Sequence, residues 1–333
     1  MGSDRRGCAG HDHTGQDRVF APCRSGYGPD MLCPLRTVPL VPGADLIVPR
    51  TSREEILAKL SKKRAENLPI WIASAGSGLV AKLLERAGAD CINTFSGARL
   101  RANGMGTMSM LWPILDSNKQ TMDYTSEDIL PAMSGDAFVC ACMNANDPLK
   151  DMVAVIEQLK AMGVMSVSNI GPSISYVDKD SQIYKVLNKS GITFQNEVEF
   201  LKVAKEMGMV TIGLAFDDED SCKLVGEAQP DVFCFHAGTT KGGLRGYDSG
   251  ETIDTTADRT EAANQKLRSL SDDVILVAHG AAMETPEEAQ FILDNTTCDG
   301  FWTGSSTERL PIERAVSAEA ERFAALRLPN RDS

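Results

Sequence analysis

The sequence lacks long apolar runs and an excess of positive charge. Its longest apolar stretches, such as VAVIEQL and DVILVAHG, fall well short of the ~20 residues that a membrane-spanning helix needs, and the N-terminus has no continuous apolar signal core. The 34 Lys and Arg residues are outnumbered by 46 Asp and Glu, which gives a formal net charge of −12. This balance argues against nucleic acid and anionic membranes as partners, because both select for basic surfaces. We therefore expect a cytoplasmic protein.

Cysteine shows no disulfide framework. The nine cysteines are an odd number without framework spacing, and five of them lie within or at the edges of apolar strand-like runs, namely Cys91, Cys140, Cys142, Cys234 and Cys298. A reduced thiol in such a run behaves as a small hydrophobic group. The pattern predicts a reducing compartment.

The N-terminal region differs in composition from the rest of the chain. Residues 1–46 are rich in Gly, Arg, Asp, Pro and Cys and have no apolar period, which predicts a poorly ordered extension before a catalytic domain over residues 47–333. Cys8, His11, His13 and Cys23 are a conceivable chelating set, but their spacing matches no zinc module. A flexible tail is the favoured interpretation.

From residue 69 onward, short apolar runs rich in β-branched residues alternate with segments of helical period. The predicted strands are 69–75, 90–95, 137–143, 165–170, 209–216, 231–237, 273–280 and 298–304. The predicted helices are 79–88, 148–163, 196–208, 218–228, a segment around 257–270, 285–295 and 310–327. Eight such units favour an α/β fold, a closed TIM (β/α)8 barrel, with a doubly wound open sheet as the alternative.

Three predicted loops are longer than the usual connection between a strand and a helix: 96–125, 171–194 and 238–257. Each follows the carboxyl end of a strand, which is the end of a barrel where active sites lie. We expect these loops to carry functional residues.

Small and basic residues at the strand ends are the candidates for substrate binding: Gly76, Ser77, Gly78, Ser96, Gly97, Arg99, Arg101, Asn169, Gly304, Ser305, Ser306, Glu308 and Arg309. Glycine and serine before a helix expose unpaired N–H groups that suit a phosphate or carboxylate, and arginine pairs with the same groups. The alternatives are plain tight turns, solvated arginines and a structural pair between Glu308 and Arg309.

Two histidines stand at equivalent strand ends. The runs CFHAG and LVAHG place His236 and His279 at the ends of the sixth and seventh strands, and no other histidine follows His13. An imidazole transfers protons near neutral pH or donates to an oxyanion, although a core role is the alternative. Glu197 is a third catalytic candidate, or an ordinary acid in the first turn of a helix. No G-x-S-x-G elbow follows a strand, which argues against a serine hydrolase.

Asp147 precedes Pro148 after the third strand. It is a candidate metal ligand, because hard cations prefer carboxylate oxygens. The alternative is an N-cap of the helix predicted at 148–163.

Seven stretches, read in order, resemble the phosphoenolpyruvate-hydrolase-like family of TIM-barrel proteins, which also occurs as the C-terminal barrel of a plant antiviral resistance protein. They are GSGLVAK, SGARLRANG, NDP, NEVEF, HAGTTKGG, HG followed by TPEEAQ, and GSSTERLPIE, within about residues 50–327. The family is similar to the phosphoenolpyruvate and pyruvate superfamily. The resemblance implies cleavage of a C–C or C–P bond beside a carbonyl, with Mg²⁺ as a cofactor held by Glu197 or Asp147.

The chain departs from the family pattern at three places near the expected pocket. Ala98 is an extra residue between Ser96–Gly97 and the two arginines. The fourth strand is followed by NIGPSIS in place of an aromatic and proline run, and the histidine of the seventh strand is followed by GAAM. These departures predict a substrate that is larger or less phosphorylated than the family name implies, and a role in specialised metabolism.

The leading hypothesis is a homo-oligomeric lyase or hydrolase that acts on a small 2-oxo acid or another enolisable carbonyl compound. One alternative is a non-catalytic barrel that binds a small ligand for signalling. The other is a retro-aldol enzyme with a Schiff-base lysine, for which Lys241 after the sixth strand is the candidate.

Overall fold

Eight parallel strands form a closed barrel. The computed structural model describes residues 51–329, in which each strand pairs with the next and β8 pairs with β1. The strands are β1 (Ile70–Ser74), β2 (Cys91–Thr94), β3 (Phe138–Cys142), β4 (Ser166–Ser168), β5 (Val210–Ala215), β6 (Val232–His236), β7 (Ile275–His279) and β8 (Gly300–Thr303). Each strand lies inside a predicted one. Because the sheet closes on itself, the predicted TIM barrel is confirmed and the alternative, an open sheet, is wrong.

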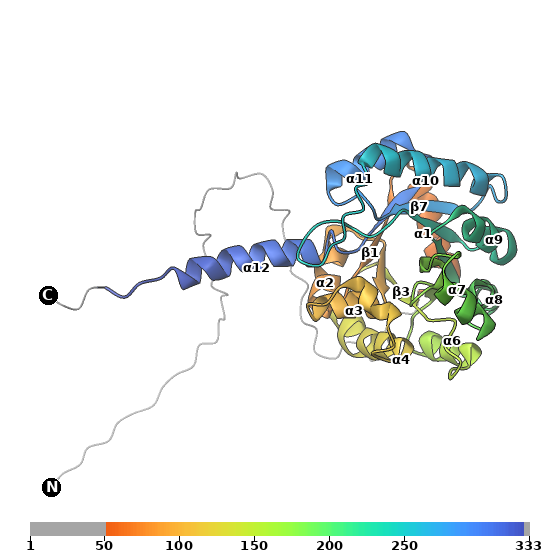
Figure 1. Cartoon of the computed structure of the whole chain (residues 1–333), viewed down its shortest axis with the longest axis horizontal. Helices are drawn as coiled ribbons and strands as arrows, with labels where there is room; N and C mark the ends of the chain where they lie inside the picture. The colour runs from red at the N-terminus through yellow and green to blue at the C-terminus, as the bar shows by residue number, and fades with distance from the viewer. Residues whose placement is uncertain (1–50, 330–333) are drawn as a thin grey trace, which may run out of the picture. The chain divides into compact units, whose positions relative to one another are not determined.

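The helices follow the strands around the barrel (Figure 1). The α-helices are α1 (Arg53–Ala65), α2 (Gly78–Ala87), α3 (Ser96–Ala102), α4 (Ser117–Tyr124), α5 (Leu130–Ala132), α6 (Met152–Ala161), α7 (Gln182–Lys189), α8 (Phe194–Glu206), α9 (Asp218–Ala228), α10 (Ile253–Arg268), α11 (Pro286–Asn295) and α12 (Arg309–Ala324). Short turns of other helix types are η1 (Thr107–Leu111), η2 (Thr125–Ile129) and η3 (Ile174–Tyr176). The long loops predicted at 96–125 and 171–194 therefore contain helices of their own.

Helix α1, which the sequence pattern did not predict, packs at the amino-terminal end of the barrel. Its Ile56 and Leu60 belong to the same buried cluster as the inward side chains of the strands. Its basic residues pair with acids that precede three strands: Lys63 with Asp90, Arg53 with Asp231, and Arg64 with Asp299. These acids also accept backbone N–H groups of neighbouring strands. Helix α1 thus closes one end of the barrel and leaves the carboxyl end for a site.

Helix α12 follows β8 and extends away from the barrel (Figure 1). Only Arg309 and Leu310, in its first turn, are buried. The outward side chains Trp71 of β1 and Phe301 of β8, which stack with ring centroids 6.1 Å apart, remain partly exposed. Since a closing helix normally covers this part of a barrel, the chain exposes an apolar surface here.

Other predictions are corrected or lie outside the described residues. Asp147 does not cap a helix, because its carboxylate accepts the N–H of Leu149 in a turn and α6 begins after the true cap, Asp151. The extension predicted over 1–46, including the candidate chelating set, is outside residues 51–329. Within residues 51–329 every cysteine is free, and no helix there is long and apolar enough to cross a membrane.

Candidate active site

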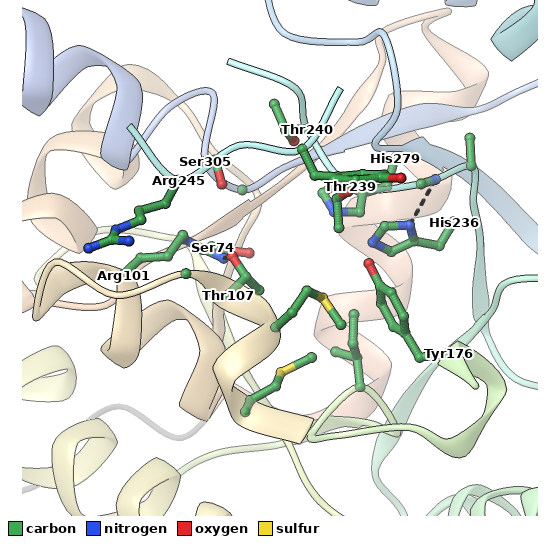
Figure 2. A pocket seen from close by; sticks show the side chains of 18 of the residues that line it. Ser74, Arg101, Thr107, Tyr176, His236, Thr239, Thr240, Arg245, His279 and Ser305 are labelled. Atoms are coloured by element: carbon green, nitrogen blue, oxygen red, sulfur yellow. Dashed lines mark hydrogen bonds between the residues drawn. The ribbon is translucent and has the colours of Figure 1, made fainter. Parts of the chain in front are cut away.

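A cavity of about 690 Å³ opens at the carboxyl ends of the strands (Figure 2). Its walls come from segments that follow β2, β4, β6 and β8, and Ser74, the last residue of β1, also lines it. All three long loops that the sequence predicts contribute to it, through Thr107, Tyr176 and Arg245. Of the residues predicted for the site, it is lined by Arg101, His236, His279, Gly304 and Ser305.

His236 and His279 are direct neighbours in the sheet. They pair in the register of β6 and β7, and their ring centroids are 4.5 Å apart in an edge-to-face arrangement. The turns that follow them are joined, since the N–H of Ala281 donates to the Gly238 carbonyl at 2.8 Å. A Cβ at Gly280 would lie 2.0 Å from the same carbonyl oxygen, so this position requires glycine. The backbone therefore fixes both imidazoles at one place on the rim.

Backbone hydrogen bonds assign opposite tautomers to the two rings. Nδ1 of His279 lies 2.7 Å from the Trp302 carbonyl, which only accepts, so Nδ1 carries the proton and Nε2 has a free lone pair. Nδ1 of His236 accepts the N–H of Gly238 at 3.2 Å, so its proton resides on Nε2. One ring therefore offers an acceptor and the other a donor.

Burial keeps both imidazoles neutral at physiological pH. It lowers the pKa of His279 from 6.5 to about 4. It also lowers the pKa of His236 well below its ordinary value, and the neighbouring His279 adds to that effect. Neutral imidazoles suit proton transfer without a preceding change of charge.

In an NMR titration, the His279 Cε1 proton is expected to shift near pH 4 rather than near 6.5. Between these values the unfolded chain binds a proton that the folded chain does not, so the free energy of unfolding should fall as the pH falls from 6.5 toward 4. A midpoint near 6.5 for this resonance would show that the ring is not desolvated as described.

Tyr176 completes the aromatic wall around His236. It belongs to η3 in the loop after β4, and its ring packs against Phe216 with centroids 3.9 Å apart. Burial raises the pKa of its phenol above the ordinary value, so the group is a neutral hydroxyl. Sequence reasoning missed this residue, although the length of the loop that carries it was a signal.

A buried ion pair links the segment between β8 and α12 to helix α3. Arg101 Nη2 lies 2.5 Å from Glu308 Oε2, and both side chains are almost fully buried. The other carboxylate oxygen of Glu308 accepts the N–H of Gly76 at 2.7 Å, and Arg101 also donates to Thr107. The pKa of Glu308 is raised by burial, against the opposing charge of Arg101. Glu308 and Arg309 therefore do not pair with each other; Arg309 pairs with Glu313 and donates to the Gly242 carbonyl.

The anion-binding site predicted at Gly76, Ser77 and Gly78 is not available to a ligand, because the protein's own groups occupy it. Besides the contact of Gly76 with Glu308, the N–H of Gly78 donates to Asp128, and Ser77 caps α2. A Cβ at Gly76 would lie 2.2 Å from the Ala98 carbonyl oxygen, so close packing explains this glycine. These N–H groups do not face the main cavity.

Other predicted residues also lie away from the main cavity. Arg99 pairs with Asp128 at 3.0 Å and donates to the Gly76 carbonyl. Ser96 and Gly97 are buried at the start of α3, and Ser306 is not among the lining residues. Lys241 is exposed and does not line the cavity either, which separates the candidate Schiff-base lysine from the histidines.

Glu197 is buried behind the site and organises two loops. Its carboxylate accepts hydrogen bonds from Asn169 Nδ2 at 2.6 Å, Ser173 Oγ at 2.7 Å and the N–H of Ile174 at 2.8 Å. Burial raises its pKa from 4.5 to about 8, against these donors. Its oxygens face the protein, and Asn169 serves the same network by bonding the backbone of Leu214.

The residues present do not match a magnesium site. The cavity is lined by one carboxylate, Glu251, and Arg259 binds both of its oxygens at 2.8 Å. Both oxygens of Asp147 are also bonded, to Leu149 N–H and Asn118. Over residues 51–329 no group of three His, Cys, Asp or Glu side chains is arranged to hold a metal ion.

Comparison with known families identifies the barrel. The family profile described as phosphoenolpyruvate hydrolase-like matches residues 55–326. This chain belongs to that family. Its relatives include the ToMV susceptible protein tm-1(GCR26) of Solanum lycopersicum, which is 30% identical over 272 residues. That match covers 81% of this chain and 35% of the tomato protein, so the phosphoenolpyruvate hydrolase-like chain spans about a third of this relative's length.

Solved structures share the fold of this phosphoenolpyruvate hydrolase-like protein at low identity. Phosphoenolpyruvate phosphomutase from Streptomyces platensis subsp. rosaceus has a TM-score of 0.52 and 16% identity, over 80% of this chain and 86% of its own. A phosphonopyruvate hydrolase, solved as a complex with oxalate and Mg²⁺, has a TM-score of 0.50, 16% identity and the same coverage. At 16% identity this similarity shows a shared fold and does not show a shared reaction.

Proposed function

We propose that this protein is a lyase or hydrolase that cleaves a C–C or C–P bond in a small 2-oxo acid or another enolisable carbonyl compound, in specialised metabolism. The observation that carries the proposal is the pair of neutral imidazoles with opposite tautomers, 4.5 Å apart in one cavity. An enolisation needs a base near the carbon acid and a donor near the carbonyl oxygen. The pair supplies both.

The anionic end of such a substrate has its own partners in the cavity. Arg245 lines the mouth, and no partner within residues 51–329 engages its guanidinium. Ser305 and Thr239 contribute hydroxyls to the same cavity. A guanidinium and hydroxyls suit a carboxylate or phosphonate, so we infer that these groups hold the anionic end of the substrate.

In hydrolysis of a β-dicarbonyl substrate, His279 Nε2 takes a proton from water as the water oxygen bonds to the carbonyl carbon. The C–C bond then breaks, and its electron pair becomes an enolate whose oxygen accepts the Nε2–H of His236. The proton on His279 passes to the enolate carbon, so the products are an acid and a ketone. Tyr176 borders the rings and limits the entry of further water.

The proposed reaction uses no Mg²⁺, because the carboxylates of Glu251 and Asp147, in and beside the cavity, already accept hydrogen bonds from protein donors. The phosphonopyruvate hydrolase neighbour is complexed with Mg²⁺. The test of the proposed function is therefore a turnover assay over 2-oxo acids, phosphonates and β-diketones, with and without Mg²⁺. Turnover of at least one class supports the proposal, and no product from any class would refute it.

A non-catalytic ligand-binding barrel is the competing function. The tomato relative is named for susceptibility to a virus, not for a reaction. This alternative predicts saturable binding of a 2-oxo acid without product, and the same assay separates the two.

We also propose that the chain forms homo-oligomers through α12. Beyond its first turn this helix exposes Val316 and Phe323, at 61% and 66%, and helix α2 exposes Leu79 and Leu83. Trp71 of β1 and Phe301 of β8 are partly exposed as well. A second copy offers both apolar surfaces at once, so one pairing would bury them.

Replacing Val316 and Phe323 together by aspartate should convert the oligomer into a monomer, because each charge would have to be buried at the contact. Analytical ultracentrifugation measures the mass of the wild type and the variant. Ile183→Asp is the control, since Ile183 is an exposed apolar residue on α7. A monomeric wild type, or an unchanged mass in the double variant, would contradict the proposal.

A further inference from the structure

A second cavity of about 500 Å³ lies at the same end of the barrel. Its walls come from the segments that follow β2, β3 and β4, through residues 111–113, 115–117, 146–149 and 172–174. Leu187 of α7 and Ile192 line it as well. Both cavities are lined by Met110, so one side chain stands between them.

Most of the polar side chains around the second cavity are already engaged. Asp116 caps α4 and pairs with Lys150 at 2.8 Å. Asn146 accepts the N–H of Thr193, and Ser173 donates to Glu197. With these groups satisfied, the second cavity offers a ligand mainly apolar surface, from residues such as Leu111, Pro113, Leu115, Ile174, Val177, Leu187 and Ile192.

The main cavity differs from the second in that several of its polar groups lack partners among the described residues. Within residues 51–329, Arg245 and the hydroxyl of Tyr176 have no hydrogen-bond partner, and the lone pair on Nε2 of His279 is free. A ligand that satisfies both cavities therefore has a polar head in one and an apolar body in the other.

Met110 is suited to a boundary between them. Its side chain is buried, and it packs over Gly97, where a Cβ would lie 2.9 Å from the Met110 sulfur and 2.5 Å from the Phe95 ring. Gly97 thus provides the space that Met110 occupies. An unbranched thioether adopts several rotamers at little cost, so we expect a rotation of Met110 to join the cavities when a ligand spans both.

We propose that the second cavity binds the apolar tail of the substrate whose carboxylate and carbonyl lie in the main cavity. The substrate class is then a 2-oxo acid or β-diketone with an alkyl or aryl tail of several carbons. The head-group assignment rests on the proposed function. The tail site rests on the lining of the second cavity and on the shared Met110.

Calorimetry with two probes, pyruvate and 2-oxooctanoate, tests this proposal. The longer acid should bind the wild type at least about tenfold more tightly, since each buried methylene contributes roughly a three- to fourfold gain. Leu187→Trp fills the second cavity and should abolish the preference with little change for pyruvate. Val186→Trp is the matched control, because Val186 is the preceding residue of α7, is 49% exposed and does not line the cavity.

Equal affinity of the two acids for the wild type, or a preference that survives Leu187→Trp, would overturn the proposal. Turnover measured on the same samples reports separately on the proposed function. A tail preference without turnover of any 2-oxo acid, phosphonate or β-diketone would refute the catalytic role and support the tail site. Failure of both acids to bind would refute the head-group assignment and, with it, this proposal.

Discussion

Replacing His279 by asparagine is expected to lower the turnover number by about 10²–10⁴-fold, the range that loss of a general base produces. Asparagine retains an N–H donor for the Trp302 carbonyl but has no group equivalent to Nε2. The variant should therefore fold normally and bind the substrate with similar affinity. The measurement is kcat and KM for any 2-oxo acid or β-diketone that the wild type converts.

A conservative change at another residue that lines the cavity provides the control. Thr240→Ser retains a hydroxyl in the loop after β6, at a position that also lines the cavity. It should change kcat by less than about threefold, because no proton transfer depends on it. If His279→Asn reduced kcat by as little as this control does, His279 would not be the base.

Glu308→Ala should lower the free energy of unfolding by about 3–5 kcal/mol. The change leaves the guanidinium of Arg101 buried without a partner, since both of their side chains are almost fully buried in the wild type. It also leaves the N–H of Gly76 unpaired. Urea denaturation, with the midpoint and slope fitted for each variant, measures the loss.

Arg99→Ala is the matched control, because it breaks an ion pair of similar length with Asp128 in which both partners are about a third exposed. It should cost about 0–1 kcal/mol. Similar losses in the two variants would show that burial of the Arg101–Glu308 pair is not what holds this rim together.

The barrel was predictable because its buried strands coincide with short apolar runs in the sequence. Every predicted strand contains an observed one, such as β6 within 231–237. The helix α1 was missed because most of its residues are charged or exposed and only Ile56 and Leu60 are buried. Its role depends on the strand ends that it covers, which periodicity along the chain does not reveal.

The candidate site was predictable only where position in a strand fixes position in space. His236 and His279 end adjacent strands, so their meeting follows from the fold. Gly76 and Arg99 are also at strand ends, yet Glu308 and Asp128 bind them, and those partners lie far away along the chain. Tyr176 lies in a long loop whose path depends on tertiary contacts. Such pairings are set by packing and not by local pattern.

Exchange of the C3 protons of a 2-oxo acid for deuterium, followed by ¹H NMR in D₂O, tests most directly whether the two histidines enolise a carbonyl compound. Removal of a C3 proton is the reverse of the proposed step in which His279 protonates the enolate carbon, so the full reaction need not be known. With pyruvate or 2-oxooctanoate, the wild type should accelerate the exchange over buffer and His279→Asn should not. Equal rates in buffer, wild type and variant would contradict the account.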